Sequence, residues 1–167
     1  MSPRTPDQID ALVGQWGAVR PDLDLTVMAR VARITEAGRQ IEARIAALAT
    51  EAGVDVAEGD ILFTLRRSGE PYRLSPSAIS AALLVSSGTL TSRLDRLERK
   101  GLVRRVPHPT DRRSLEVELT DEAVGIVDAG VTRHVENEAE MLSVLSEREQ
   151  AQLDRLLRKL LAGLAGA

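Results

Sequence analysis

The sequence contains no cysteine, and only Trp16, Phe63 and Tyr72 of its 167 residues are aromatic. Without cysteine the chain can form neither disulfides nor thiolate metal sites. Without aromatic platforms, stacking on single-stranded bases is disfavoured. No apolar run approaches the roughly 18 residues of a membrane helix, and the first ten residues do not resemble a signal peptide. We therefore expect a cytoplasmic protein with no membrane partner and an aliphatic core, which suits helices.

Residues that carry catalysis are also scarce. The two histidines, His108 and His134, are far apart in the sequence, and neither has a serine–acid pair nearby. No glycine-rich phosphate loop follows a strand pattern, and no His spacing is typical of zinc sites. His134 and Glu138 have i,i+4 spacing, which is more simply a solvated helix face than a metal site. We expect no enzyme, no cofactor and no metal.

What the sequence does contain is a helix-turn-helix pattern followed by a hairpin, in residues 74–120. In the second helix Leu90, Leu94 and Leu97 recur at i, i+4 and i+7, which forms one apolar stripe. Ser86 or Ser87 can cap its start and Gly101 can end it.

The preceding helix starts at Ser75-Pro76, with serine as cap and proline at the first helical position. Its predicted inner face consists of Ile79, Leu83 and Leu84. The break between the two helices, residues 85–88, is short enough for helix-turn-helix geometry.

After Gly101 the apolar period changes from 3.6 to 2. Leu115, Val117 and Leu119 alternate with glutamates, which predicts a half-buried strand. Residues 102–106 supply its partner, and we expect Pro107 and Pro109 to stop the pairing at the tip.

Charge is distributed unevenly along the chain. Residues 66–113 hold eleven Lys/Arg against four Asp/Glu, a local charge of +7, whereas the whole chain carries −3. An ordinary solvated face is the simple explanation of a charge run. Combined with helix-turn-helix spacing and a basic hairpin, the asymmetry favours a nucleic-acid-binding face.

These motifs together resemble those of MarR-family transcription regulators, which are dimeric bacterial winged-helix proteins. The resemblance rests on SSGTLTSRLDRLERKGLVRR followed by DRRSLEVELT, with the family's Asp-x-Arg wing motif at Asp111 and Arg113 and its Leu-Thr at Leu119 and Thr120. With the flanking helices it covers roughly residues 25–165. The expected fold class is mainly α with a small β-hairpin wing, a winged helix-turn-helix with long N- and C-terminal dimerisation helices.

The resemblance predicts how the chain would meet double-stranded operator DNA. The helix from Ser87 would enter the major groove, where arginine can pair with guanine, and Arg113 of the wing would enter the minor groove. The predicted DNA-contacting residues are Ser75, Ser77, Ser86, Ser87, Gly88, Thr89, Ser92, Arg93, Arg96, His108, Asp111, Arg112 and Arg113. The alternative class is a helical dimeric interaction module whose basic hairpin binds an acidic protein or RNA.

The flanking segments predict a homodimer. We expect residues 1–53 to form an N-terminal extension and a dimerisation helix, 54–120 the DNA-binding region, and 121–167 the C-terminal dimerisation helices. Met28, Ile34, Ile41, Ile45 and Leu48 form the predicted inner face of the long helix over residues 25–52. The leucines of residues 153–164 are too many for a helix exposed to water, so that helix needs a partner.

An effector site is implied by the resemblance alone. In the urate-responsive branch of the family, a tryptophan, an aspartate and two arginines form the pocket, and these match Trp16, Asp60, Arg93 and Arg105. By itself Trp16 is an ordinary core or interface residue, and Asp60 is equally well a first-turn acid facing the helix dipole. The predicted effector is a small anion such as urate or a carboxylate. The expected function is a repressor that the anion releases from a pseudo-palindromic operator.

Overall fold

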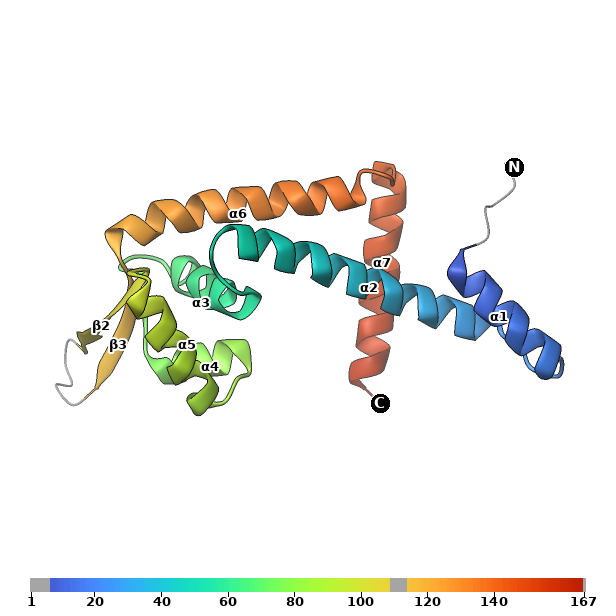
Figure 1. Ribbon diagram of the computed structural model, residues 1–167, viewed down its shortest axis with the longest axis horizontal. Coiled ribbons are helices and arrows are strands. Elements are labelled where there is room, and N and C mark those ends of the chain that lie inside the picture. Colours follow the sequence, from blue (N-terminus) through green and yellow to red (C-terminus); the bar gives the residue numbers. More distant parts are fainter. Residues whose placement is uncertain (1–6, 109–113, 167) are drawn as a thin grey trace. The chain divides into compact units, whose positions relative to one another are not determined.

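The protein is mainly helical, with one small sheet. The computed structural model describes residues 7–108 and 114–166 (Figure 1). The elements are α1 (Gln8–Val19), α2 (Thr26–Glu51), α3 (Val56–Arg67), β1 (Arg73–Leu74), α4 (Pro76–Leu83), α5 (Ser87–Arg99), β2 (Val103–Pro107), β3 (Leu115–Leu119), α6 (Asp121–Leu142) and α7 (Glu147–Ala165). The predicted fold class, a winged helix-turn-helix between long helices, is confirmed.

The chain divides into two compact units, Met1–Ala46 and Ala47–Ala167. In the first unit, the capping box of Asp7 and Asp10 starts α1. Arg33 of α2 holds both carboxylates, with its Nε 2.8 Å from Asp7 Oδ2 and its Nη2 2.6 Å from Asp10 Oδ1. These contacts fasten α1 to α2 and lower the pKa of Asp7 to about 2, chiefly through the hydrogen bond from Arg33.

The apolar positions of α1 and α2 are not buried within the single chain. Neither helix contains a buried residue. The expected inward residues Met28, Ile34 and Ile41 are 37%, 49% and 42% exposed. Their amphipathic spacing is as predicted, but the described residues leave these side chains partly exposed.

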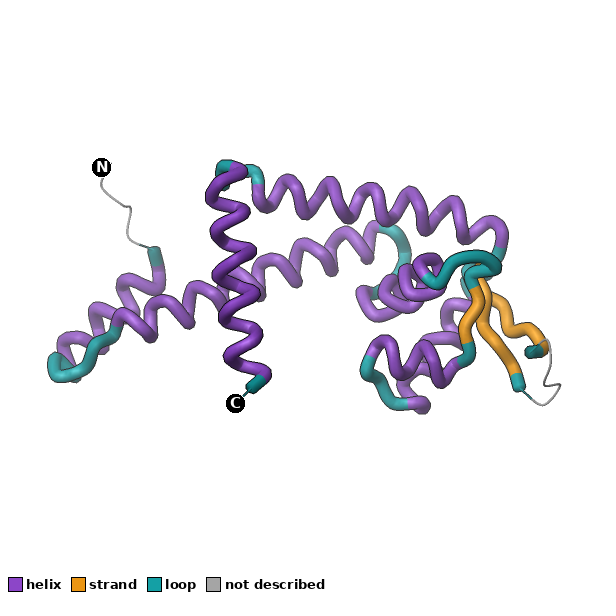
Figure 2. The backbone as a smooth tube through the Cα atoms, turned by 180° about the vertical axis from the view of Figure 1, so that it is seen from behind, coloured by secondary structure: helices purple, strands orange, loops and turns teal. Residues whose placement is uncertain are grey.

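The hydrophobic core lies in the second unit, where α3, α4, α5 and the sheet meet the start of α6. Figure 2 shows the strands beside these short helices. The apolar stripe of α5, which consists of Leu90, Leu94 and Leu97, is buried, as its spacing predicts. The other fully buried apolar side chains include Ile61, Leu65, Ile79 and Val117.

The sheet has three antiparallel strands in the order β1-β3-β2, whereas the sequence predicts a two-stranded hairpin. Two residues of β1 pair with β3, with Arg73 opposite Glu118. Because β1 covers that edge, Glu118 is only 4% exposed, and the expected alternation of buried leucines with solvated glutamates is wrong at this position. The partner strand is one residue longer than predicted: Pro107 is the last residue of β2 and pairs with Leu115. Pro109 lies outside the described residues.

The helix-turn-helix is capped as predicted at Ser75 and Ser86. The turn between the two helices differs from the prediction at one residue. Leu84, expected on the inner face of α4, is the C-cap residue with φ 54° and ψ 37°, and it is 93% exposed. A left-handed residue at this point turns the chain, which directs the Leu84 side chain outward while Leu83 and Val85 pack on the core.

Helix α6 packs on α3 through polar and aromatic contacts. The Arg66 guanidinium forms a bidentate pair with Asp128, at 2.7 and 3.0 Å, and lies over the Tyr72 ring. His134, expected on a solvated face, instead packs edge-on against Phe63, with ring centroids 5.8 Å apart. Within the described residues no helix is long and apolar enough to span a membrane.

Candidate nucleic-acid interface

Helix α5 presents a small, polar N-terminus to the outside. Ser86 caps it by accepting a hydrogen bond from the Thr89 N–H at 3.4 Å, and Ser92 bonds back to the Thr89 carbonyl at 3.0 Å. Since the leucine stripe occupies the opposite face, Ser87, Gly88, Thr89 and Ser92 are all exposed. Short side chains at a helix start permit close approach of the backbone to phosphates and base edges.

The two arginines predicted to reach DNA from α5 have different surroundings. Arg93 is half-buried and has no hydrogen-bond or ion-pair partner in the described part of the chain. Arg96 does have partners: its Nε is 2.8 Å from Glu58 Oε1, and its Nη2 is 3.2 Å from Asp55 Oδ2. The guanidinium of Arg96 therefore points to the start of α3, although its position on the helix suggested an outward face.

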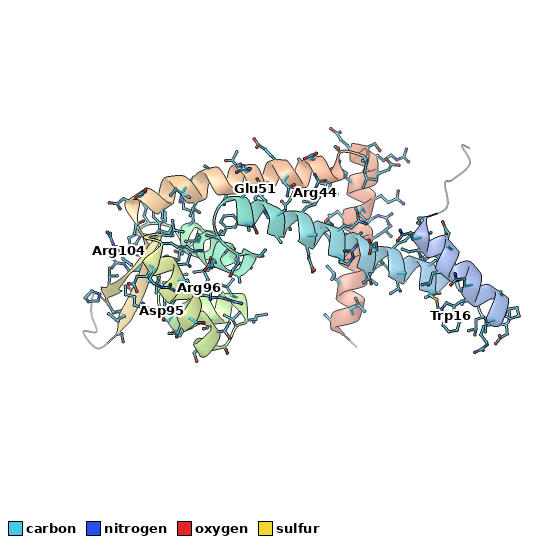
Figure 3. The ribbon with its side chains drawn as sticks, in the orientation of Figure 1. Trp16, Arg44, Glu51, Asp95, Arg96 and Arg104 are labelled. Carbon is cyan, nitrogen blue, oxygen red and sulfur yellow. The ribbon has the colours of Figure 1, made fainter. Side chains whose placement is uncertain are left out.

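The opposite flank of α5 is held by Arg105 of β2. Arg105 Nη2 is 2.5 Å from Asp95 Oδ1, and the guanidinium also pairs with Glu98, whose other oxygen accepts the Arg105 backbone N–H at 3.2 Å. The hydrogen bond to Asp95 outweighs partial burial and raises the pKa of Arg105. Figure 3 labels Asp95 and Arg96 on this helix. Contacts from both flanks thus attach α5 to the body of the unit.

A buried carboxylate organises the base of the sheet. Glu118 lies between Arg73, whose Nε donates to Oε2 at 2.5 Å, and Arg104, whose Nε donates to Oε1 at 2.5 Å. Burial opposes ionisation of Glu118, but the hydrogen bonds from Arg104 and Arg73 prevail and lower its pKa. Near the wing, His108 Nε2 is 3.8 Å from Glu116.

The other predicted DNA contacts are placed only in part. Ser75 Oγ caps α4, accepting the Ala78 N–H at 3.2 Å, and lies 2.9 Å from the exposed Ser77 hydroxyl. Both serines border the helix-turn-helix. Asp111, Arg112 and Arg113 lie outside the described residues, so their roles stay predictions.

The proposed effector residues fall in different units. Trp16 belongs to the unit of residues 1–46, where it is 47% exposed. Asp60, Arg93 and Arg105 belong to the unit of residues 47–167. Asp60 is exposed, and its backbone carbonyl accepts a hydrogen bond from the Thr64 hydroxyl at 2.7 Å. Nothing in the described residues gathers three or more potential ligands for a metal ion.

Internal pairing reduces the free charge of this region well below the +7 of residues 66–113. At least six of its eleven cations contact carboxylates of the same chain: Arg66, Arg73, Arg96, Lys100, Arg104 and Arg105. The sequence did not predict their partners, which are Asp55, Glu58, Asp95, Glu98, Glu118 and Asp128. The one feature of the sequence that singles out any of these acids is the capping-box spacing of Asp55 and Glu58. That spacing predicts the start of a helix, but it does not predict a contact with α5.

A helix-turn-helix capped by serines and packed against a small antiparallel sheet defines a winged-helix DNA-binding protein. The sequence profile of the MarR family matches residues 52–114. Over 150 residues the chain is 42% identical to the HTH-type transcriptional regulator PecS of Dickeya dadantii, covering 90% of each protein. The chain belongs to the MarR family of DNA-binding transcription regulators.

Solved structures support this assignment. A mutant of MarR from E. coli complexed with operator DNA superposes with a TM-score of 0.66 at 26% identity, covering 82% of this chain and 97% of that one. AbsC, a MarR-family regulator from Streptomyces coelicolor, gives a TM-score of 0.72 over 87% of this chain and 98% of its own, and at 23% identity it supports the fold alone. These matches favour the DNA-binding class over the interaction module, and the family is not one of enzymes.

Proposed function

We propose that the protein is a homodimeric cytoplasmic repressor, released from a pseudo-palindromic operator by a small anion. Helix α5 enters the major groove with Ser87, Gly88, Thr89, Ser92 and Arg93 foremost, and the wing follows the adjacent minor groove. A twofold dimer reads two half-sites about one helical turn apart, roughly 34–36 Å. One observation carries the proposal: the first turn of α5 is polar and exposed, while the leucine stripe on its opposite face is buried. The chain's membership of the MarR family gives this exposed face its DNA-binding interpretation.

The dimer is supported by the apolar surface of the single chain. Helix α7 has no buried residue. Its leucines at 153, 156, 157, 160, 161 and 164 are 37–66% exposed. An apolar face of this extent needs a partner, and a second copy of the same helices provides a self-complementary one.

Release by an anion is supported by the contacts of Arg105. This arginine is already bound to two carboxylates of α5, so it has the charge and the fork geometry that an anionic ligand needs. An anion bound at Arg105 would compete with Asp95 and Glu98 and loosen one attachment of the recognition helix. Trp16, Asp60 and Arg93 join the proposed effector residues from the family resemblance alone. We rank urate first, followed by aconitate and citrate.

The test uses the fluorescence of Trp16, the only tryptophan. Each of the three anions is titrated into wild type and into Arg105→Ala while DNA release is followed by anisotropy of a labelled promoter duplex. We expect one anion to change Trp16 emission and release the DNA from wild type, and to have a weaker effect on Arg105→Ala. To release DNA, the anion must bind the DNA-free conformation more tightly. If no anion acts, or if both proteins respond alike, the effector proposal fails and DNA binding stands.

A further inference from the structure

The most deeply buried carboxylate of the second unit lies where α3 meets the recognition helix. The Glu58 side chain is 2% exposed. Its Oε1 accepts the Arg96 Nε–H at 2.8 Å, and its Oε2 accepts a hydrogen bond from Lys100 Nζ at 2.6 Å. Both cations belong to α5 or its C-cap, so one acid of α3 holds two bases of the DNA-reading helix.

The local structure of α3 orients this carboxylate. Asp55 and Glu58 form a reciprocal capping box: Asp55 Oδ1 accepts the Glu58 N–H at 2.8 Å, and Glu58 Oε2 accepts the Asp55 N–H at 3.1 Å. Asp55 Oδ2 is 3.2 Å from Arg96 Nη2, and the Gly53 carbonyl accepts a hydrogen bond from Lys100 Nζ at 2.9 Å. The acceptors of the α2–α3 turn therefore converge on Arg96 and Lys100.

The cluster stays ionised under physiological conditions. Burial by itself would raise the pKa of Glu58, but the hydrogen bonds from Lys100, Arg96 and the Asp55 backbone lower it to about 2. The side chains of Arg96 and Lys100 are 40% and 37% exposed. They are thus partly accessible to solvent, and Glu58 is what directs them to the protein.

We propose that Glu58 is a specificity-determining residue that acts through α5: it withholds Arg96 and Lys100 from DNA phosphates and holds the recognition helix against α3. The proposal deepens the DNA recognition by α5 described above and rests on it. Arg96, predicted from the sequence as a DNA contact, is on this view a positioning residue. Arg93, which lies one turn earlier and has no ionic partner in the described residues, remains a DNA contact.

The physical reason lies in how phosphate contacts affect selectivity. Each cation that neutralises a phosphate releases counterions and strengthens binding to any sequence. Base contacts and sequence-dependent DNA shape, by contrast, distinguish the operator from other DNA. A recognition helix with two additional free cations would therefore gain nonspecific affinity, while a helix no longer held at α3 would present its base-reading residues less accurately.

The salt dependence of binding separates these roles. The probes are a duplex selected by the wild-type protein from a random library and a scrambled duplex of the same composition. The slope of log K against log salt is measured for wild type, Arg96→Gln, Lys100→Gln and the matched control Arg93→Gln. We expect Arg93→Gln to make the slope shallower by about one unit, and Arg96→Gln and Lys100→Gln to leave it unchanged.

The Glu58→Gln variant tests the opposite change, in which Arg96 and Lys100 are released from their carboxylate. Freeing two cations should steepen the slope by up to about two units and raise affinity for the scrambled duplex, so that the ratio of selected to scrambled affinity falls at least several-fold. Adding Arg96→Gln and Lys100→Gln to Glu58→Gln should restore the wild-type slope. Circular dichroism identifies any variant that has not folded. This triple variant removes the charges of Glu58, Arg96 and Lys100 together, and the Asp55 carboxylate that remains is exposed to solvent.

Two results would overturn the proposal. The first is an Arg96→Gln slope that falls as much as that of Arg93→Gln, which would make Arg96 a phosphate contact. The second is a folded Glu58→Gln that binds both duplexes with the wild-type slope and ratio. If wild type itself fails to distinguish the duplexes, DNA recognition by α5 is wrong, and that failure is visible before any variant is compared.

Discussion

Leu84 occupies a backbone conformation that suits glycine better. Its φ of 54° lies in the left-handed region, and its side chain is 93% exposed, so no packing offsets the strain. This conformation costs a non-glycine residue roughly 1–2 kcal/mol. A glycine at this position avoids that cost, but it loses more conformational entropy on folding, which offsets part of the gain in stability. We expect Leu84→Gly to raise the free energy of unfolding by about 0.5–1 kcal/mol. Leu84→Ala, which keeps the Cβ, serves as the control in urea unfolding at one protein concentration. Equal stability of the two variants would show that the turn is unstrained.

Glu58 should also leave a signature in the pH dependence of stability. Its pKa is lowered from 4.5 to about 2. A lowered acid pKa contributes stability above the unfolded value, and this contribution is lost as the pH falls through the folded value. Between pH 4.5 and pH 2, the free energy of unfolding of wild type should therefore fall by about 1–2 kcal/mol more than that of Glu58→Gln. The full lowering of the pKa corresponds to roughly 3 kcal/mol, but partial solvation of Arg96 and Lys100 reduces the effect. Parallel stability curves for the two proteins, measured by urea unfolding at several pH values, would refute this.

At the scale of elements, the third strand changes what the wing depends on. Strand β1 brings Arg73 to Glu118, whose carboxylate then joins it to Arg104 of β2. Removing a buried acid leaves its basic partners unpaired. We expect Glu118→Ala to lower the free energy of unfolding by about 2 kcal/mol, because both arginines are only partly buried. Glu116→Ala is the matched control on the same strand. Among the described residues its nearest bases, Arg73 and His108, are 3.8 Å away, so its loss should stay below about 1 kcal/mol. Similar losses for the two glutamates would mean that β1 contributes no ionic link.

At the scale of the whole molecule, stability and assembly should be inseparable. None of the leucines of α7 is buried by the described residues of one chain. Deleting residues 150–167 should yield misfolded or aggregated protein, because the proposed interface is also the core of these helices. Leu160→Glu should make the melting temperature fall and depend more steeply on protein concentration, while Arg158→Glu, an exposed site on the same helix, should have little effect. Recovery of a folded, monodisperse monomer of the truncated chain in light scattering would contradict the homodimer.

The sequence by itself determined whatever depends on neighbours along the chain. Caps at Ser75 and Ser86, the left-handed ends at Gly53 and Gly101, and the leucine stripe of α5 were all predictable, since each arises from interactions within about four residues. Local periodicity also predicted which face of α5 is polar and exposed. The order of these elements was specific enough to indicate the family.

Only the tertiary structure decided which charges are free. Arg96 and Arg105 are both arginines of a basic stretch, yet the first is bound by Glu58, 38 residues away, and the second by two acids of α5. Strand β1 is two residues long and exists because β3 lies beside it, and that pairing buries Glu118. Periodicity reports which face of an element is apolar, but ion pairs between elements depend on where distant segments meet. For that reason the sequence could indicate a DNA-binding surface. Which of its cations are already paired with carboxylates, and which are not, depends on the fold.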